Sequence, residues 1–222
     1  MKTKQTGFTL VEIAIVLVII GLLLGGILKG QEMIIQAKVK NSLTDFSGVS
    51  AAFYGYQDRY RAIPGDDAGA GRWTIPVGVI AGNNDRILTG VYDTTALAAV
   101  APANESAQWW DHLRRSGFVT GASGATNPIN SFNGILGVQQ GDGAGVGATA
   151  PGSILPAAGG MTNLMLCSTN LPDKVAIALD VQMDDGNPAT GAVRAVLGTN
   201  LTTAIAPYVE TGTNLYTICR QF

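Results

Sequence analysis

The chain has few of the residues that enzyme active sites and metal centres need. Its 222 residues include one histidine, His112, and two cysteines, Cys167 and Cys219. Two cysteines and one histidine cannot complete a tetrahedral zinc site, and cysteines so far apart in the chain do not form a redox Cys-x-x-Cys pair. No Gly-x-Ser-x-Gly motif is present, and the glycine-rich stretch 141–147 lacks the Lys-Ser/Thr of a phosphate-binding loop. The sequence therefore predicts a protein that is not an enzyme and has no cofactor, apart from the calcium ion considered below.

Charge is also scarce. Charged residues make up 14% of the chain, and the formal net charge is −2. A nucleic-acid-binding surface needs a cluster of lysines and arginines to neutralise phosphates. Because the sequence has no such basic stripe, we expect no direct nucleic-acid site.

A long apolar run near the N-terminus is the feature that the chain does have. It extends from Phe8 to Leu28, and its single acidic residue is Glu12. A helix of this length covers about 30 Å, which is the thickness of a bilayer core. An ordinary secretory signal has a shorter apolar core with a small-x-small cleavage site directly after it, and no Ala-x-Ala directly follows this run. Because an ionised carboxylate inside a membrane span is energetically costly, Glu12 needs a partner.

The start of the apolar run reads Gly7-Phe8-Thr9-Leu10-Val11-Glu12 and follows a short segment that contains two lysines. This motif resembles the prepilin processing signal of the type IV pilin and type II secretion pseudopilin superfamily. The resemblance covers about residues 1–60, and weaker similarities occur at residues 109–114 and 184–188. It implies that a membrane peptidase cuts between Gly7 and Phe8 and that the new N-terminus at Phe8 is methylated.

The resemblance also implies a role for Glu12 in assembly. In the superfamily, the acid at this position neutralises the N-terminal amine of a neighbouring subunit, here the amine on Phe8, and this pairing sets the axial register. The residues alone leave a second interpretation open. Glu12 lies about 6 Å along the helix from Phe8, so its side chain could extend to the membrane interface instead.

A structural subunit of a type IV pilus-like extracellular filament is the function that the resemblance implies, serving adhesion, motility or DNA uptake. Its partners would be other copies of the chain, the prepilin peptidase, the inner-membrane assembly platform and, before assembly, membrane lipid. The precursor is expected in the bacterial inner membrane, and the assembled protein in an extracellular pilus or a periplasmic pseudopilus. Two alternatives stay open: a pseudopilin of a type II secretion system, and a membrane-tethered binding module that never polymerises.

The apolar pattern continues beyond the membrane-length run as an amphipathic helix. Apolar residues recur at near-helical spacing from Met33 to Tyr60, and Pro64-Gly65 is expected to end the helix. The predicted fold is α+β, a pilin-like roll in which this long helix packs against an antiparallel β-sheet. The expected domains are a leader peptide (1–7), a transmembrane and assembly half of the helix (8–28), an amphipathic half (29–63) and a globular head (64–222).

Local patterns in the head predict one short helix and several strands. Glu105–Phe118 is predicted to be a helix capped by Gly117, with His112 at its surface. Alternating apolar residues predict a strand over Val175–Gln182, a return strand over Gly191–Leu197 and a last strand over Tyr216–Cys219.

The two cysteines predict a disulfide. An even pair favours a bridge between Cys167 and Cys219 in an oxidising compartment. In pilins, such a C-terminal bridge bounds a loop region that is exposed on the filament, and the resemblance implies the same here.

One acidic cluster in the sequence has oxygen ligands of the kind that calcium binds. It consists of Asp180, Asp184, Asp185 and Asn187. The sequence lacks the EF-hand pattern, and Asp184–Pro188 is also typical of an ordinary hairpin turn. Both interpretations, a calcium site and a turn, depend on what surrounds Asp180 in the fold.

Overall fold

Helix α1 extends over Leu10–Tyr60 and contributes to both compact units of the chain, Met1–Lys38 and Val39–Phe222. The structure, a computed structural model, describes residues 9–73, 81–93, 104–124, 126–141, 160–201 and 205–222. In the first unit, the apolar side chains of α1 are exposed on all sides. By length and composition, α1 is the one helix among the described residues that is able to cross a membrane. Its first half therefore has the apolar, membrane-length character of the segment that the sequence predicts over residues 8–28.

In the second unit, α1 buries a single stripe of side chains. The buried residues recur at spacings of mostly three or four: Val39, Ser42, Phe46, Val49, Ala52, Phe53 and Tyr56. Lys40, Asn41 and Ser47, which lie between them, are exposed. Because residues three and four apart share one helix face, this is the amphipathic stripe expected from the sequence.

The helix ends before the Pro64-Gly65 signal. Arg61 has a φ of +54°, and its amide donates a hydrogen bond to the carbonyl of Gln57 at 2.8 Å. A residue in the left-handed region directly after the last turn is a common way for a helix to end.

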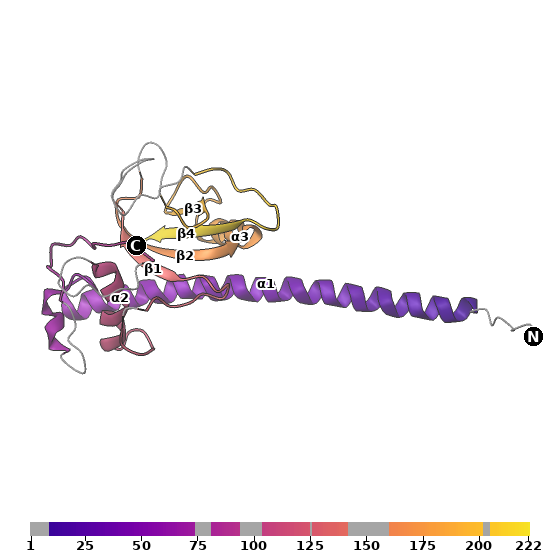
Figure 1. Cartoon of the computed structure of the whole chain (residues 1–222), viewed down its shortest axis with the longest axis horizontal. Coiled ribbons are helices and arrows are strands. Elements are labelled where there is room, and N and C mark those ends of the chain that lie inside the picture. Colours follow the sequence, from indigo (N-terminus) through magenta and orange to yellow (C-terminus); the bar gives the residue numbers. More distant parts are fainter. Residues whose placement is uncertain (1–8, 74–80, 94–103, 125, 142–159, 202–204) are drawn as a thin grey trace, which may run out of the picture. The chain divides into compact units, whose positions relative to one another are not determined.

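The sheet of the second unit has four antiparallel strands in the order β1-β2-β4-β3 (Figure 1). They are β1 (Leu136–Gln140), β2 (Leu164–Pro172), β3 (Val193–Leu197) and β4 (Leu215–Gln221). The pairing of β2 with β4 shifts register between Ser168 and Leu171, where Asn170 has a φ of +58°. The return strand and the last strand expected from the sequence correspond to β3 and β4.

The described residues of the second unit also form two further α-helices and a short 3₁₀ helix: η1 (Ala68–Arg72), α2 (Glu105–Arg115) and α3 (Asp173–Met183). Helix α2 confirms the predicted short helix, and Gly117 follows it with a φ of +81°. The described fold is α+β, with the long helix packed against an antiparallel sheet, as predicted.

The prediction of a strand over Val175–Gln182 is wrong, because these residues belong to α3. The apolar residues alternate, but burial follows a helical period: Val175 and Leu179, four residues apart, are buried, whereas Val181 is 60% exposed. The residues between them include Ala176 and Ala178, and alanine is the strongest helix former. Alternation over so short a segment cannot separate a strand from a helix.

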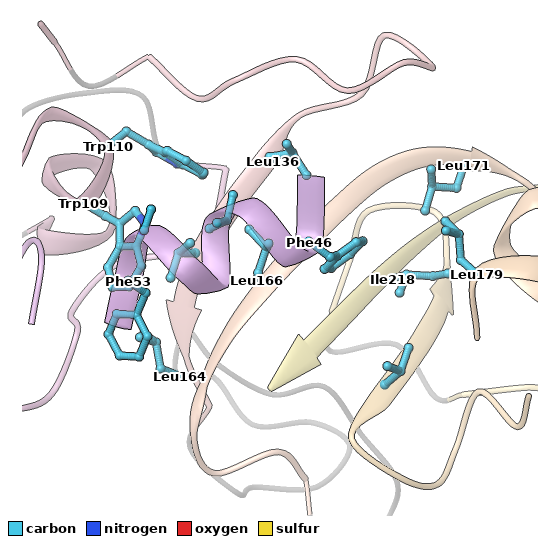
Figure 2. Packing of buried hydrophobic residues seen from close by; sticks show 14 of the residues in the cluster. Phe46, Phe53, Trp109, Trp110, Leu136, Leu164, Leu166, Leu171, Leu179 and Ile218 are labelled. Atoms are coloured by element: carbon cyan, nitrogen blue, oxygen red, sulfur yellow. The ribbon is translucent and has the colours of Figure 1, made fainter. Parts of the chain in front are cut away.

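The core lies between the buried stripe of α1, helix α2 and the sheet. Phe46 and Phe53 of α1 contribute to the same cluster as Trp109 and Trp110 of α2, together with strand residues such as Leu166 (Figure 2). The rings of Phe53 and Trp109 stack with centroids 5.2 Å apart. The second half of α1 is therefore an integral part of the head.

His112 is not at the surface of its helix, contrary to the prediction. It is fully buried, and its Nδ1 accepts a hydrogen bond from the amide of Gly65 at 2.9 Å. Its ring lies beside those of Tyr56 and Trp73. Helix α2 is enclosed at this point because the segment that follows α1 packs over it.

Candidate assembly site at the start of helix α1

Glu12 lies in the first turn of α1, where the described part of the chain begins. The predicted cleavage and methylation residues, Gly7 and Phe8, lie outside the described residues. Thr9 directly precedes the helix, so it occupies the N-cap position and Glu12 is the third residue of the helix.

Thr9 and Glu12 form a reciprocal cap. The amide and the hydroxyl of Thr9 both donate hydrogen bonds to Oε2 of Glu12 at 2.8 Å. The amide of Glu12 in turn lies 3.3 Å from the Thr9 hydroxyl, which accepts from it. This is the capping-box arrangement, which satisfies backbone amides that have no partner within the helix.

The capping box leaves Glu12 partly unsatisfied. Both contacts from Thr9 fall on Oε2, and Oε1 accepts no hydrogen bond from any described residue. No described lysine or arginine lies within 4.0 Å of the carboxylate. The arrangement can therefore hold Glu12 in one orientation while its outer oxygen accepts from a positively charged group outside the chain.

The first half of α1 has an apolar surface with small residues that allow close approach. Leu10 is 91% exposed and Leu22 is 74% exposed. A Cβ placed on Gly21, Gly25 or Gly26 would meet no atom within 4 Å. Small residues spaced four apart allow helix backbones to approach closely. This surface is suited to lipid and to other apolar helices.

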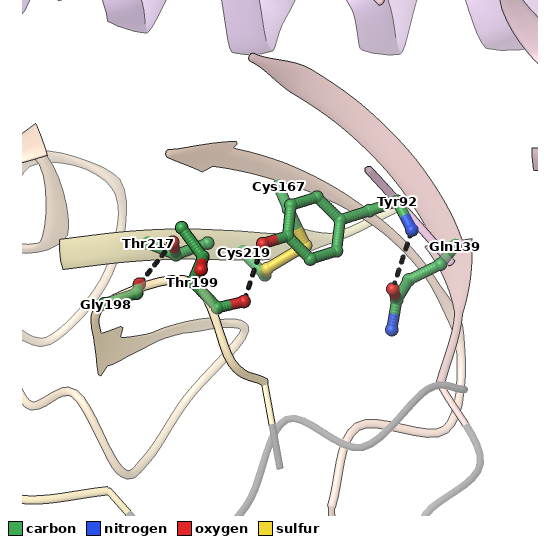
Figure 3. The surroundings of a disulfide bond; sticks show 7 residues. All are labelled: Tyr92, Gln139, Cys167, Gly198, Thr199, Thr217 and Cys219. Atoms are coloured by element: carbon green, nitrogen blue, oxygen red, sulfur yellow. Dashed lines mark hydrogen bonds between the residues drawn. A yellow bond between two sulfur atoms is a disulfide. The ribbon is translucent and has the colours of Figure 1, made fainter. Parts of the chain in front are cut away.

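Cys167 and Cys219 form a disulfide across the neighbouring strands β2 and β4 (Figure 3). Both cysteines are buried, and 52 residues separate them in the chain. Beside the bridge, the hydroxyl of Tyr92 donates to the carbonyl of Thr199 at 2.7 Å. The bridge therefore links the two central strands of the sheet.

The structure brings together the three carboxylates of the acidic cluster predicted around Asp180. Carboxylate oxygens of Asp180, Asp184 and Asp185 lie within 4.8 Å of one another. The side-chain oxygen of Asn187, the fourth predicted residue, accepts a hydrogen bond from the amide of Ala189. Asp184–Pro188 lies in a loop that turns the chain, as the turn interpretation predicts, but it joins helix α3 to strand β3 and is therefore not a hairpin turn.

Asp180 is the buried member of that cluster. Its Oδ2 accepts a hydrogen bond from the hydroxyl of Tyr208 at 2.7 Å, and its Oδ1 has no partner. Burial raises the pKa of Asp180, although the hydrogen bond from Tyr208 opposes this effect. The donor set fits a cation that prefers carboxylate oxygens, such as calcium.

Residues 2–28 match the family described as the prokaryotic N-terminal methylation motif. This motif is the prepilin-type signal of type IV pilins and pseudopilins, so the match supports a type IV pilin-like or pseudopilin-like protein. It implies processing by the prepilin peptidase and filament assembly in general, and it indicates a structural, non-enzymatic protein. No curated protein and no solved structure matches the chain.

The apolar pattern of the sequence singles out Glu12 but not its capping partner, Thr9. The signal was available, since Thr9-x-x-Glu12 directly before a helical apolar run is the sequence pattern of a capping box.

Proposed function

We propose that this chain is a structural subunit of a type IV pilus-like extracellular filament. In this proposal the precursor is cut between Gly7 and Phe8 in the bacterial inner membrane, and the mature subunits polymerise through the first half of α1. The observation that carries the proposal is the first half of α1, whose apolar side chains are exposed on all sides and whose apolar run up to Leu28 holds a single acid, Glu12, at its N-terminal end. Such a surface is stable only in lipid or against other apolar helices.

Cleavage would supply the partner that Glu12 lacks. It would create a charged amine on Phe8, four residues before Glu12 in every copy. Within a bundle of apolar helices, a carboxylate and an ammonium group each need the other, because an unpaired buried charge is strongly destabilising. Pairing Glu12 of one copy with the amine of a neighbour would therefore permit only one axial position between the two helices.

Mass spectrometry of the protein from its host tests the processing step. The expected chain begins at Phe8 and carries one methyl group on its N-terminal nitrogen. A chain that still begins at Met1, with Phe8 internal, would contradict the proposal.

Electron microscopy of fibres sheared from cells tests the polymer. Thin extracellular filaments that contain this chain are expected, identified with an antibody against the head or by mass spectrometry of the fibres. Short polymers confined to the periplasm would favour the pseudopilin alternative. A processed protein that stays in the membrane and forms no polymer would favour the tethered binding module.

The calcium ion expected at Asp180, Asp184 and Asp185 stays a prediction. The unpartnered Oδ1 of Asp180 supports it. A calcium titration of the full-length protein and of Asp180→Asn, followed by calorimetry, tests it. An equal number of bound calcium ions in the two proteins would exclude the site.

A further inference from the structure

A second carboxylate cluster lies where the segment after α1, the loop after residue 80 and the start of α2 meet, and the sequence patterns do not predict it. Asp66 follows α1, Asp85 lies in the loop, and Glu105 is the first residue of α2. Carboxylate oxygens of these three residues lie within 4.8 Å of one another.

Two of the three carboxylates are removed from water. Asp66 and Glu105 are each 0% exposed, and Asp85 is exposed. No lysine or arginine in the described part of the chain forms an ion pair with any of them. The neighbouring Asp67, in contrast, pairs with Arg72 at 2.6 Å. Three carboxylates gathered without a counter-ion repel one another strongly in a buried site.

Hydrogen bonds orient this cluster but do not saturate it. Oδ2 of Asp66 accepts from the amide of Arg86 at 2.7 Å. Glu105 accepts from the amide of Asn83 through Oε1 and from the amide and hydroxyl of Thr89 through Oε2. Each carboxylate oxygen has two lone pairs, so Oε1 of Glu105 can accept once more, whereas both lone pairs of its Oε2 are used by Thr89.

Asp85 is held in the same way. Its Oδ1 accepts from the amide of Ile87 and its Oδ2 from the side-chain amide of Asn83, each at 2.8 Å. Because Asp85 is exposed, it connects the buried pair to solvent and provides a path by which an ion can enter.

Oδ1 of Asp66 is the observation that points to a ligand. This atom is buried and has no hydrogen-bond partner. A buried charged oxygen without a partner is costly, and native proteins nearly always satisfy such atoms. A bound cation would satisfy Oδ1 and would also remove the repulsion among the three carboxylates.

The backbone around the cluster is shaped for close approach. A Cβ on Gly82 would lie 2.3 Å from the Cα of Asp66. Gly65 has a φ of +86°, and a Cβ there would lie 2.4 Å from the carbonyl oxygen of Glu105. Any larger residue at either position would push apart the segments that carry the carboxylates, so both glycines are needed to bring the three together.

We propose that Asp66, Asp85 and Glu105 bind a divalent cation of the calcium type. The bound ion would link the loop formed by residues 81–87 and the start of α2 to the segment that follows α1. Calcium accepts six to eight oxygen ligands in flexible geometry, and carboxylates are its usual charged ligands. Magnesium demands a smaller, near-octahedral set and is expected to bind more weakly. This proposal does not depend on filament assembly.

Thermal unfolding of the full-length mature protein in detergent, with and without calcium, tests the site. A ligand that binds only the folded state stabilises it in proportion to the logarithm of its concentration. At a calcium concentration one hundred times Kd, the melting temperature is expected to rise by about 5–10 °C. Magnesium at the same concentration is expected to give a smaller shift. No shift with calcium would overturn the proposal.

Variants in an Asp180→Asn background separate this site from the other acidic cluster. The calcium shift is expected to persist in Asp180→Asn and to disappear when Asp66→Asn is added. If Asp66→Asn prevents folding, Asp85→Asn serves instead, because Asp85 is exposed; its calcium affinity is expected to fall at least about tenfold. A calcium shift that disappears with Asp180→Asn alone, or that survives the loss of both Asp66 and Asp85, would contradict the assignment.

Discussion

The two halves of α1 have the same backbone structure and opposite surroundings. Residues 10–38 expose apolar side chains on every side, whereas residues 39–60 bury one stripe and leave the rest half-buried or exposed. The second half finds its apolar partners within its own chain, in α2 and the sheet. The first half has none among the described residues of its chain, and must find them in lipid or in other copies. One continuous helix therefore has one half inside an intramolecular core and another half whose apolar surface is left for lipid or, in the proposed filament, for other copies.

Because the two halves of α1 differ in their surroundings, we expect substitutions in them to be detected by different assays. Changes in the first half should affect assembly and leave the stability of the head unchanged. Changes in the second half should affect the free energy of unfolding of the head, whatever happens to assembly.

The largest expected effect is that of Glu12→Ala on assembly. Without the carboxylate, the amine freed on Phe8 would have no partner inside the bundle, so filament yield is expected to fall at least about tenfold while membrane insertion continues. Sheared filaments and membrane-bound subunit are measured by immunoblot. Glu32→Ala is the matched control, because Glu32 is an exposed acid of the same helix that pairs with Lys29 at 2.7 Å. Equal yields from wild type and Glu12→Ala would refute the register role.

Phe46→Ala tests the other half of the helix. Phe46 is 1% exposed in the core, so its truncation leaves a cavity and is expected to lower the free energy of unfolding by about 3–5 kcal/mol. Urea unfolding of the mature protein in detergent measures the change. Ile19→Ala is the control, since Ile19 is 51% exposed, and a change within about 0.5 kcal/mol is expected. Equal losses in the two variants would mean that the halves do not differ as described.

Removal of the disulfide should weaken the head only. The double substitution Cys167→Ala and Cys219→Ala opens a loop of 52 residues and is expected to cost about 3–4 kcal/mol. Denaturant unfolding measures the loss. A reducing agent should lower the stability of the wild type by a similar amount and leave that of the double variant unchanged. If the reductant affects both proteins alike, the bridge is not its target.

The smallest expected effect is a pH dependence of the folding stability that comes from Asp67. Burial by itself would raise the pKa of Asp67, but hydrogen bonds from Arg72, Tyr56 and the amide of Gly69 outweigh it and lower the pKa. A lowered pKa in the folded state contributes stability above the unfolded-state pKa, which is about 3.9 for aspartate. This contribution is lost as the pH falls through the lower folded-state pKa.

Asp67→Asn should therefore make the loss of stability below about pH 4 less steep than in the wild type. Thermal unfolding between about pH 2 and pH 6 compares the two proteins. The control is Asp58→Asn, because the Asp58 side chain is 84% exposed and lies 3.7 Å from Arg61. A slope that is equally steep in the wild type and in Asp67→Asn would show that this carboxylate is not responsible.

For two other acids, Asp66 and Glu105, burial has the opposite net effect on the pKa. It raises the pKa values of Asp66 and Glu105, although backbone hydrogen bonds to these carboxylates oppose the rise. In the metal-free protein their contribution to stability declines as the pH rises from the unfolded-state pKa to the raised one. The Asp67 effect is therefore isolated only as the difference between the wild type and Asp67→Asn.

Residue patterns predicted the features that depend on local sequence. The apolar run, Glu12 within it, the amphipathic continuation and the short helix at Glu105 all follow from periodicity and residue type. The strand predicted over Val175–Gln182 failed because a short alternating segment with alanines fits both a strand and a helix, and packing beside Tyr208 and the sheet selects the helix.

Other features depend on residues that are distant in the sequence. His112 is buried because the segment after α1 folds back over α2, and its partner, Gly65, precedes it by 47 residues. The cluster of Asp66, Asp85 and Glu105 has no sequence motif, because its members come from three separate segments. Long-range packing alone brings such groups together.

Hydrophobicity and helical period are local properties, so the order of residues alone specifies a membrane-length apolar helix with one acid near its start. The folded arrangement is needed to show which half of that helix is covered by its own chain and which acids share a buried site. Both depend on where the sheet and α2 pack, and packing is set by complementary surfaces that no single segment contains.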